Sequence, residues 1–174
     1  VGDLSVVDLN WPFAGFDGTL DDVKAALARN NLRAVAITPE IYNKDYIKGS
    51  ITNPDPDVRA QALKVLHEAT ALAKDLGCDY VKLWFGQDGW DYPFQVDYHE
   101  IWNLACDGLR ELVGAHPDIK FVIEYKPREP RNKIIFPNAA RTLLAIQQVG
   151  LDNLGILLDF GHSLYGGESP ADAA

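Results

Sequence analysis

Five short runs of apolar, β-branched and aromatic residues are spaced along the chain. They cover residues 4–9, 33–38, 80–85, 120–125 and 154–160. Runs of this length and composition predict buried β-strands, as in a sheet that is covered on both faces.

The segments between these runs carry apolar residues at the period of an α-helix. Their apolar stripes predict helices over residues 19–31, 58–76, 98–113 and 137–149. The clearest is the helix at 58–76, which follows the start signal Asp55-Pro56 and stops at Gly77. Ser169-Pro170 has the form of another helix start.

The order of these elements is strand, helix, strand throughout, with no hairpin turn between strands. This order predicts parallel strands joined by right-handed crossovers, and therefore an α/β fold. Asn10-Trp11-Pro12-Phe13 follows the first strand, where a dinucleotide-binding sheet has a glycine-rich turn, so a (β/α)8 TIM barrel is favoured over a doubly wound sheet. A complete barrel needs roughly 250 residues. We therefore expect an incomplete one, a single partial domain over residues 1–174 with about five consecutive βα units.

The composition narrows the class of partner. With 47% hydrophobic and 24% charged residues, the chain can bury a core. The net charge of -9 and the lack of any Lys/Arg cluster argue against a nucleic acid or a membrane surface as partner. The two cysteines, Cys78 and Cys106, are expected to be reduced core residues, and we expect a cytoplasmic protein.

Two strand ends carry the residues that are candidates for chemistry. Glu124 and Lys126 are two residues apart at the end of one predicted strand, so both point to the same side. Asp159 ends the next strand, and His162 follows it. Barrel enzymes have their active sites at this face, and carboxylates with one imidazole suit Mg²⁺, Mn²⁺ or Co²⁺, with Zn²⁺ as an alternative.

A purely structural interpretation of these residues stays open. Glu124 and Lys126 can form an ion pair with no further role, and a single histidine is more often structural than a ligand. The other histidines, His67, His99 and His116, lie on or beside predicted helices away from the strand ends, and we assign them no role.

Three motifs carry a family resemblance. The segment 124–131, Glu-Tyr-Lys-Pro-Arg-Glu-Pro-Arg, resembles the Glu-x-Lys-Pro-x-Glu-Pro segment of xylose isomerases and L-rhamnose isomerases. The segments 159–162, Asp-Phe-Gly-His, and 83–86, Leu-Trp-Phe-Gly, resemble two further motifs of that superfamily. The resemblance implies a TIM barrel from roughly its second to its sixth strand, and a sugar isomerase that is a homo-oligomer when complete.

The resemblance also implies roles for individual residues. Glu124 and Asp159 would bind a metal ion, and Asp159 with His162 would face a second one. Lys126 and Glu124 would act in catalysis, with Lys126 hydrogen-bonded to the sugar near C1. Four residues are expected to contact the sugar: Trp84, Trp11, Phe13 and His162.

Several functions are compatible with these residues. The preferred hypothesis is a divalent-metal-dependent isomerase that interconverts an aldose and a ketose at C1 and C2. A ketose 3-epimerase or inosose-type enzyme is the nearest alternative, and Lys126 favours the isomerase over it. A metal-dependent endonuclease fits the acidic composition poorly. A non-catalytic binding module is the alternative from another class.

Overall fold

A parallel sheet of five strands forms the centre of the computed structural model, which describes residues 4–13 and 15–174. The strands lie in the order β1 (Val6–Trp11), β2 (Arg33–Pro39), β3 (Tyr80–Leu83), β5 (Lys120–Glu124) and β8 (Leu154–Leu157). Every neighbouring pair is parallel, and each strand follows its neighbour in chain order. This is the strand order of a (β/α) barrel, and it confirms the predicted α/β fold.

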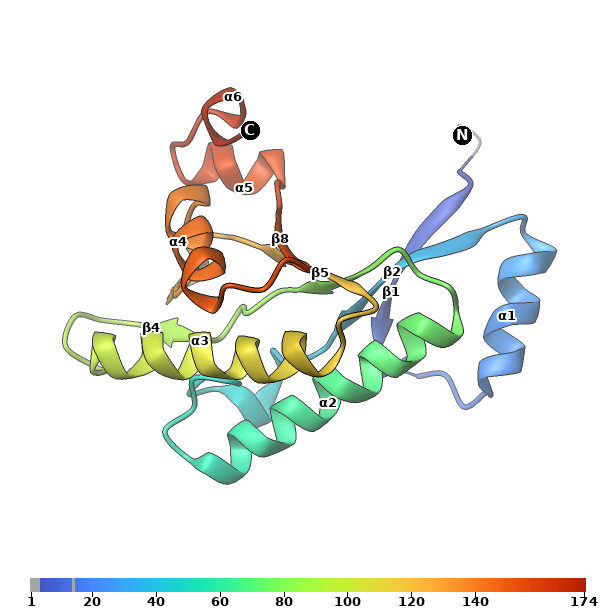
Figure 1. Ribbon diagram of the computed structural model, residues 1–174, viewed down its shortest axis with the longest axis horizontal. Coiled ribbons are helices and arrows are strands. Elements are labelled where there is room, and N and C mark those ends of the chain that lie inside the picture. The colour runs from blue at the N-terminus through green and yellow to red at the C-terminus, as the bar shows by residue number, and fades with distance from the viewer. Residues whose placement is uncertain (1–3, 14) are drawn as a thin grey trace.

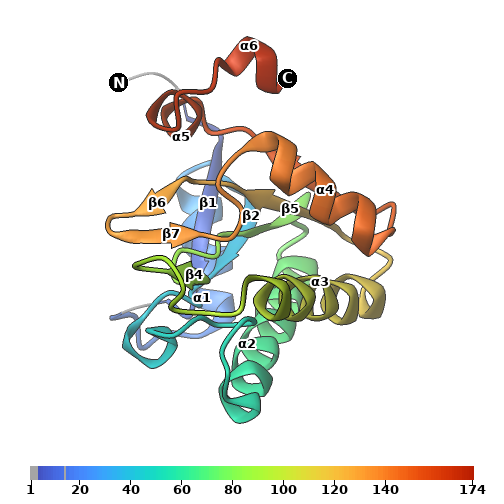
Figure 2. The same ribbon diagram turned by 90° about the vertical axis from the view of Figure 1, so that its left-hand side faces the viewer.

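Four helices connect these strands: α1 (Leu20–Arg29), α2 (Pro56–Asp75), α3 (Tyr98–Ala115) and α4 (Ala139–Val149). Figure 1 shows α2 and α3 side by side along the sheet, with α1 beside β1 and β2. In the view turned by 90°, α2, α3 and α4 lie on one side of the sheet (Figure 2). Thr19 caps α1 in a capping box with Asp22. No helix among the described residues is long and apolar enough to cross a membrane.

The two faces of the sheet differ in polarity. Fully buried side chains on the helix-covered face form the core between sheet and helices: Ile37, Val81, Leu83, Phe121 and Ile123. Because side chains alternate along a strand, Lys82 and Glu124 point to the opposite face, which is the lumen side of a barrel. Charged groups therefore collect in the lumen and apolar groups under the helices.

The ends of several elements differ from the sequence prediction. The first strand is Val6–Trp11 and not 4–9, because β1 pairs with β2 through Trp11. The last strand ends at Leu157, and a helix that the pattern did not predict, α5 (Phe160–Tyr165), follows it. Asp159 is therefore the N-cap of α5 and not the end of a strand. A second short helix, α6 (Pro170–Ala173), begins after Ser169 as expected.

A small second sheet was not predicted from the sequence. Its strands are β4 (Gly89–Trp90), β7 (Asn132–Ile134) and β6 (Arg128–Glu129), all antiparallel. They lie in the two long loops after β3 and β5, where no alternating pattern marks them. Gly89 is required there, since a Cβ atom would lie 1.8 Å from the carbonyl oxygen of Lys133.

A fully buried carboxylate joins two of the loops. Asp88 accepts hydrogen bonds from the backbone N–H groups of Ser50 and Thr52, both at 2.9 Å, and from their hydroxyl groups at 2.5 and 2.8 Å. Its own carbonyl accepts a bond of 2.8 Å from the backbone N–H of Ile135 in the segment after β7. Burial raises the pKa of Asp88, and the four hydrogen bonds oppose that shift. Asp88 thus fixes the loops that border the carboxyl ends of the strands.

Replacing Asp88 with asparagine is expected to lower the free energy of unfolding by about 3 kcal/mol. The amide has one acceptor oxygen, and its NH2 group would face donors that then lack a partner. Urea denaturation followed by circular dichroism measures the change. Asp17→Asn, at an exposed loop position, is the matched control. Equal stability of the two variants would contradict this account of Asp88.

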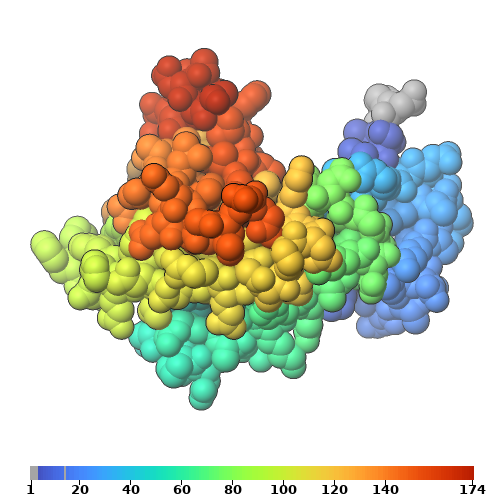
Figure 3. Space-filling model, viewed as in Figure 1, coloured from blue at the N-terminus to red at the C-terminus, as the bar shows by residue number. Residues whose placement is uncertain are grey.

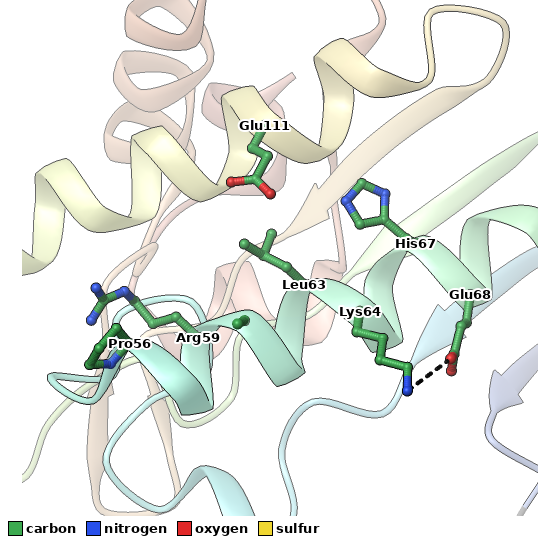
Figure 4. A pocket seen from close by; sticks show the side chains of 8 residues that line it. Pro56, Arg59, Leu63, Lys64, His67, Glu68 and Glu111 are labelled. Atoms are coloured by element: carbon green, nitrogen blue, oxygen red, sulfur yellow. Dashed lines mark ion pairs between the residues drawn. The ribbon is translucent and has the colours of Figure 1, made fainter.

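A surface hollow lies between α2 and α3, away from the strand ends. It has a volume of about 550 Å³ and is lined by Pro56, Arg59, Ala60, Leu63, Lys64, His67, Glu68 and Glu111. Figure 4 shows these side chains on the two helices, with the Lys64–Glu68 ion pair at one side. Its charges are of both signs, and none of its residues is a candidate from the sequence.

A chain of polar groups links the same two helices. Nδ1 of His67 lies 2.8 Å from Nε2 of His116, and Nζ of Lys74 lies 3.1 Å from Nδ1 of His116. Lys74 also pairs with Asp118. Burial lowers the pKa of His116, and the positive charge of Lys74 and the neighbouring His67 lower it further.

The lowered pKa of His116 predicts that stability falls as the pH drops below about 6.5. The unfolded chain then gains a proton that the folded chain resists. His116→Gln is expected to flatten the dependence of unfolding free energy on pH between about 6.5 and 5. Parallel slopes for the parent protein and His116→Gln would show that His116 is not the responsible group.

Candidate metal and sugar site

Two neighbouring strands bring the predicted carboxylates together. Glu124 on β5 is paired in register with Leu157 on β8, and Asp159 follows Leu157 by two residues. The period of two therefore places Glu124 and Asp159 on the same side. One ligand atom from each of Glu124, Asp159 and His162 lies within 4.8 Å of the others. In the space-filling view the surface is hollowed between the C-terminal segment, which includes α5, and the N-terminal segment, which includes β1 (Figure 3).

The two carboxylate oxygens of Asp159 have different surroundings. Oδ1 accepts a hydrogen bond of 2.9 Å from the backbone N–H of His162 and so caps α5. That bond lowers the pKa of Asp159, and the charges of His162 and Lys126 act in the same direction against its partial burial. The side chain is ionised at neutral pH, and Oδ2 is left for another partner.

His162 is held by a backbone carbonyl. Its Nδ1 lies 3.1 Å from the carbonyl oxygen of Tyr125 and 3.4 Å from Oε1 of Glu124. A carbonyl can only accept, so Nδ1 donates in the contact with Tyr125. The same nitrogen lies 4.0 Å from Oδ2 of Asp159, so Nδ1 is the ring atom that faces both carboxylates.

A buried pair of hydroxyl groups fixes the start of α5. The Tyr125 hydroxyl lies 2.5 Å from Oγ of Ser163, which donates a bond of 3.1 Å to the carbonyl oxygen of Asp159. Both side chains are almost completely buried. Asp159 and His162 therefore sit on a turn whose position is set by β5.

Glu124 has a partner that the sequence analysis missed. Nζ of Lys82 on β3 lies 3.1 Å from Oε2 of Glu124 and 2.8 Å from Oδ2 of Asp8 on β1. Burial tends to lower the pKa of Lys82, and its hydrogen bond to Asp8 with the charges of both carboxylates raises it overall. A charged residue inside the predicted buried strand 80–85 was the signal that could have identified it.

Lys126 does not pair with Glu124. The interpretation of these two residues as a structural ion pair required that contact. Its ammonium group donates to Glu129 of β6 and lies 5.6 Å from the centre of the Trp84 ring. Trp84 in turn meets Tyr42 edge to face, with the ring centres 4.4 Å apart. A Cβ atom at position 86 would lie 3.0 Å from the Trp84 ring, so a side chain there would crowd the ring. Nε1 of Trp84 is buried without a hydrogen-bond partner.

Trp11 and Phe13 lie in a separate group. Their rings meet edge to face with centres 5.3 Å apart, and Phe13 also contacts Phe16. The rings of the described residues show no contact between this group and Trp84. The structure thus brings Trp84 and Lys126 together near the carboxylates and leaves Trp11 and Phe13 at the end of β1.

Comparison with known proteins decides the family. The profile of the xylose isomerase-like TIM barrel family matches residues 7–174. The chain belongs to this family. Xylose isomerase of Thermus thermophilus is 27% identical over 150 residues, which cover 83% of this chain and 39% of that enzyme. The chain thus spans about two fifths of the length of this relative.

Solved structures of the same fold include epimerases and a zinc-bound protein. A structure of L-ribulose 3-epimerase superposes with a TM-score of 0.75 at 19% identity, covering 92% of this chain and 52% of that one. The crystal structure of the IOLI protein with a bound zinc atom has a TM-score of 0.72 at 17% identity, covering 97% of this chain and 57% of that one. At these identities the likeness establishes the fold of this xylose isomerase-like chain. The reaction has to be inferred from the chain's own residues.

Proposed function

We propose that this xylose isomerase-like chain carries part of the active site of a divalent-metal-dependent sugar isomerase that interconverts an aldose and a ketose at C1 and C2. The observation that supports it most is the convergence of Glu124, Asp159 and His162 within 4.8 Å at the carboxyl ends of two adjacent strands. The complete enzyme, which we expect to be a homo-oligomer, would supply the remaining groups of the site.

The donor set fits a divalent ion. Two carboxylate oxygens and one imidazole nitrogen suit Mg²⁺, Mn²⁺ or Co²⁺, and also Zn²⁺. Oε1 of Glu124 and Oδ2 of Asp159 lie 3.4 and 4.0 Å from Nδ1 of His162, and the other hydrogen bonds of the two carboxylates leave these oxygens for the ion. Bound there, the ion would supply Lewis acidity toward the oxygens of the sugar.

The other residues of the site would bind and orient the sugar. Lys126 is held beside the carboxylates by Glu129, from where its ammonium group can donate to a sugar oxygen on which negative charge develops. Trp84 offers an aromatic surface to the C–H face of a sugar, and its buried Nε1–H is a donor without a partner. Trp11 and Phe13 form a separate group at the end of β1 that packs against the hydrophobic core, and they are not part of this proposal.

A ketose 3-epimerase is the second candidate. It is favoured by the ion pair between Lys126 and Glu129, because a lysine bound to a carboxylate is less free to reach a sugar oxygen. In an epimerase the hydrogen at C3 would be exchanged, whereas an isomerase changes C1 and C2.

Nuclear magnetic resonance on a panel of aldoses and ketoses in D2O separates these functions. The Mn²⁺-loaded or Mg²⁺-loaded enzyme is expected to convert a ketose into its C2 aldose, and EDTA should stop the conversion. Inversion at C3 without an aldose product would establish the epimerase instead. Metal binding without turnover of any sugar would indicate a non-catalytic binding module.

A further inference from the structure

Three charged side chains form a continuous chain across the lumen face of the sheet. Asp8 on β1, Lys82 on β3 and Glu124 on β5 are joined by contacts of 2.8 and 3.1 Å to the single ammonium group of Lys82. The intervening strand β2 contributes Ala36 opposite Asp8, and this small residue leaves room for the contact across it.

The chain is anchored at its far end. Thr38, which is almost fully buried, donates its hydroxyl to Asp8, with distances of 2.9 and 3.1 Å to the two carboxylate oxygens. The exposed fractions of the side chains fall from 30% at Asp8 to 22% at Lys82 and 11% at Glu124. Screening by solvent therefore decreases along the chain toward Glu124.

The two oxygens of Glu124 have different surroundings as a result. Oε2 receives Lys82, while Oε1 lies 3.4 Å from Nδ1 of His162 and faces the side of Asp159. A carboxylate with both oxygens free rotates about its last bond and loses that freedom when a metal binds. A carboxylate that is already fixed through one oxygen does not have this entropic cost.

We propose that Lys82, anchored by Asp8, is a positioning residue that fixes Glu124 so that Oε1 alone is presented to the metal ion. The inference rests on the metal site of the proposed function and deepens it. Lys82 touches neither the metal ion nor the sugar in this role, and acts through Glu124.

Charge has to be separated from positioning in the test. Removing Lys82 alone leaves an extra negative charge beside the site, which attracts a cation and masks the lost orientation. Asp8 and Lys82 together carry no net charge. The double variant Asp8→Asn/Lys82→Met therefore keeps the net charge of the site and removes only the support of Glu124.

Mn²⁺ binding to the protein is measured by isothermal titration calorimetry and by electron paramagnetic resonance. We expect the dissociation constant of the double variant to rise 10- to 100-fold, roughly the loss seen when the supporting partner of a metal ligand is removed. Lys82→Arg, which can still reach both carboxylates, should stay within about threefold of the parent protein by the same criterion. The matched control is Arg33→Met/Asp79→Asn, a neutral pair with bonds of 2.8 and 2.9 Å at the exposed amino end of the sheet.

The results separate this inference from the proposed function. Unchanged Mn²⁺ affinity in the folded double variant overturns the role of Lys82 while the metal site stands. No Mn²⁺ binding by the parent protein overturns both. Weakened binding in the double variant, with no sugar turnover in the parent, supports Lys82 and overturns the isomerase. If the double variant is unfolded, Asp8→Asn/Lys82→Gln takes its place, with the same expected loss and the same contrary result.

Discussion

Replacing Asp159 with asparagine is expected to weaken Mn²⁺ binding by at least about 100-fold, the upper end of what loss of a ligand's supporting partner costs. Asparagine is as good a helix cap as aspartate, so the bond to the backbone of His162 is kept and the unfolding temperature should change little. The negative charge that Oδ2 offers to a cation is lost. Calorimetric titration and differential scanning calorimetry on the same sample measure the two effects.

The control for Asp159 is another carboxylate in the same part of the chain. Asp172 is exposed in the first turn of α6, and Asp172→Asn should leave Mn²⁺ affinity unchanged. If Asp159→Asn keeps the affinity of the parent protein within threefold, Asp159 is only the cap of α5.

Replacing Lys126 with methionine is expected to lower turnover in the complete enzyme by about 10²- to 10³-fold, as when a comparable donor to a developing charge is removed. The metal affinity should stay close to that of the parent, because Glu124 is paired with Lys82 and not with Lys126. Steady-state kinetics and Mn²⁺ titration together show whether the loss lies in turnover or in the metal site.

Lys133→Met provides the comparison for Lys126. Lys133 is an exposed lysine of β7 whose ammonium group donates to the carbonyl oxygen of Asp91, 2.9 Å away. Its loss should not affect turnover. Near-normal turnover of Lys126→Met, or loss of the metal together with unfolding, would make Lys126 a structural residue. The preference for an isomerase over an epimerase would then lose its main support.

The convergence of Glu124 and Asp159 could be predicted because it follows from two local rules. Alternation of strands and helices makes neighbouring strands parallel, and the period of two sets the side to which each residue points. The prediction did not need the position of any other side chain. It also held although Asp159 proved to be a helix cap, because the cap position follows the end of β8 directly.

The partners of the lysines could not be predicted in the same way. Lys126 is two residues from Glu124 in the sequence, yet it forms its ion pair with Glu129, because the chain leaves β5 and turns into β6. Lys82 and Asp8 are 74 residues apart in the sequence, and only the pairing of three strands brings them together.

The sequence by itself determined the order of the five parallel strands and of the four helices between them, their approximate extents, and the placing of the two carboxylates at or just beyond the ends of neighbouring strands. These features depend on periodicity and capping within short segments, which the local chemistry of the chain specifies. The tertiary structure alone decided which charges neutralise one another, where Asp88 fixes the loops, and how the second sheet forms between two distant loops. Such contacts depend on strand register and on loop paths, and both are settled only when the whole core packs.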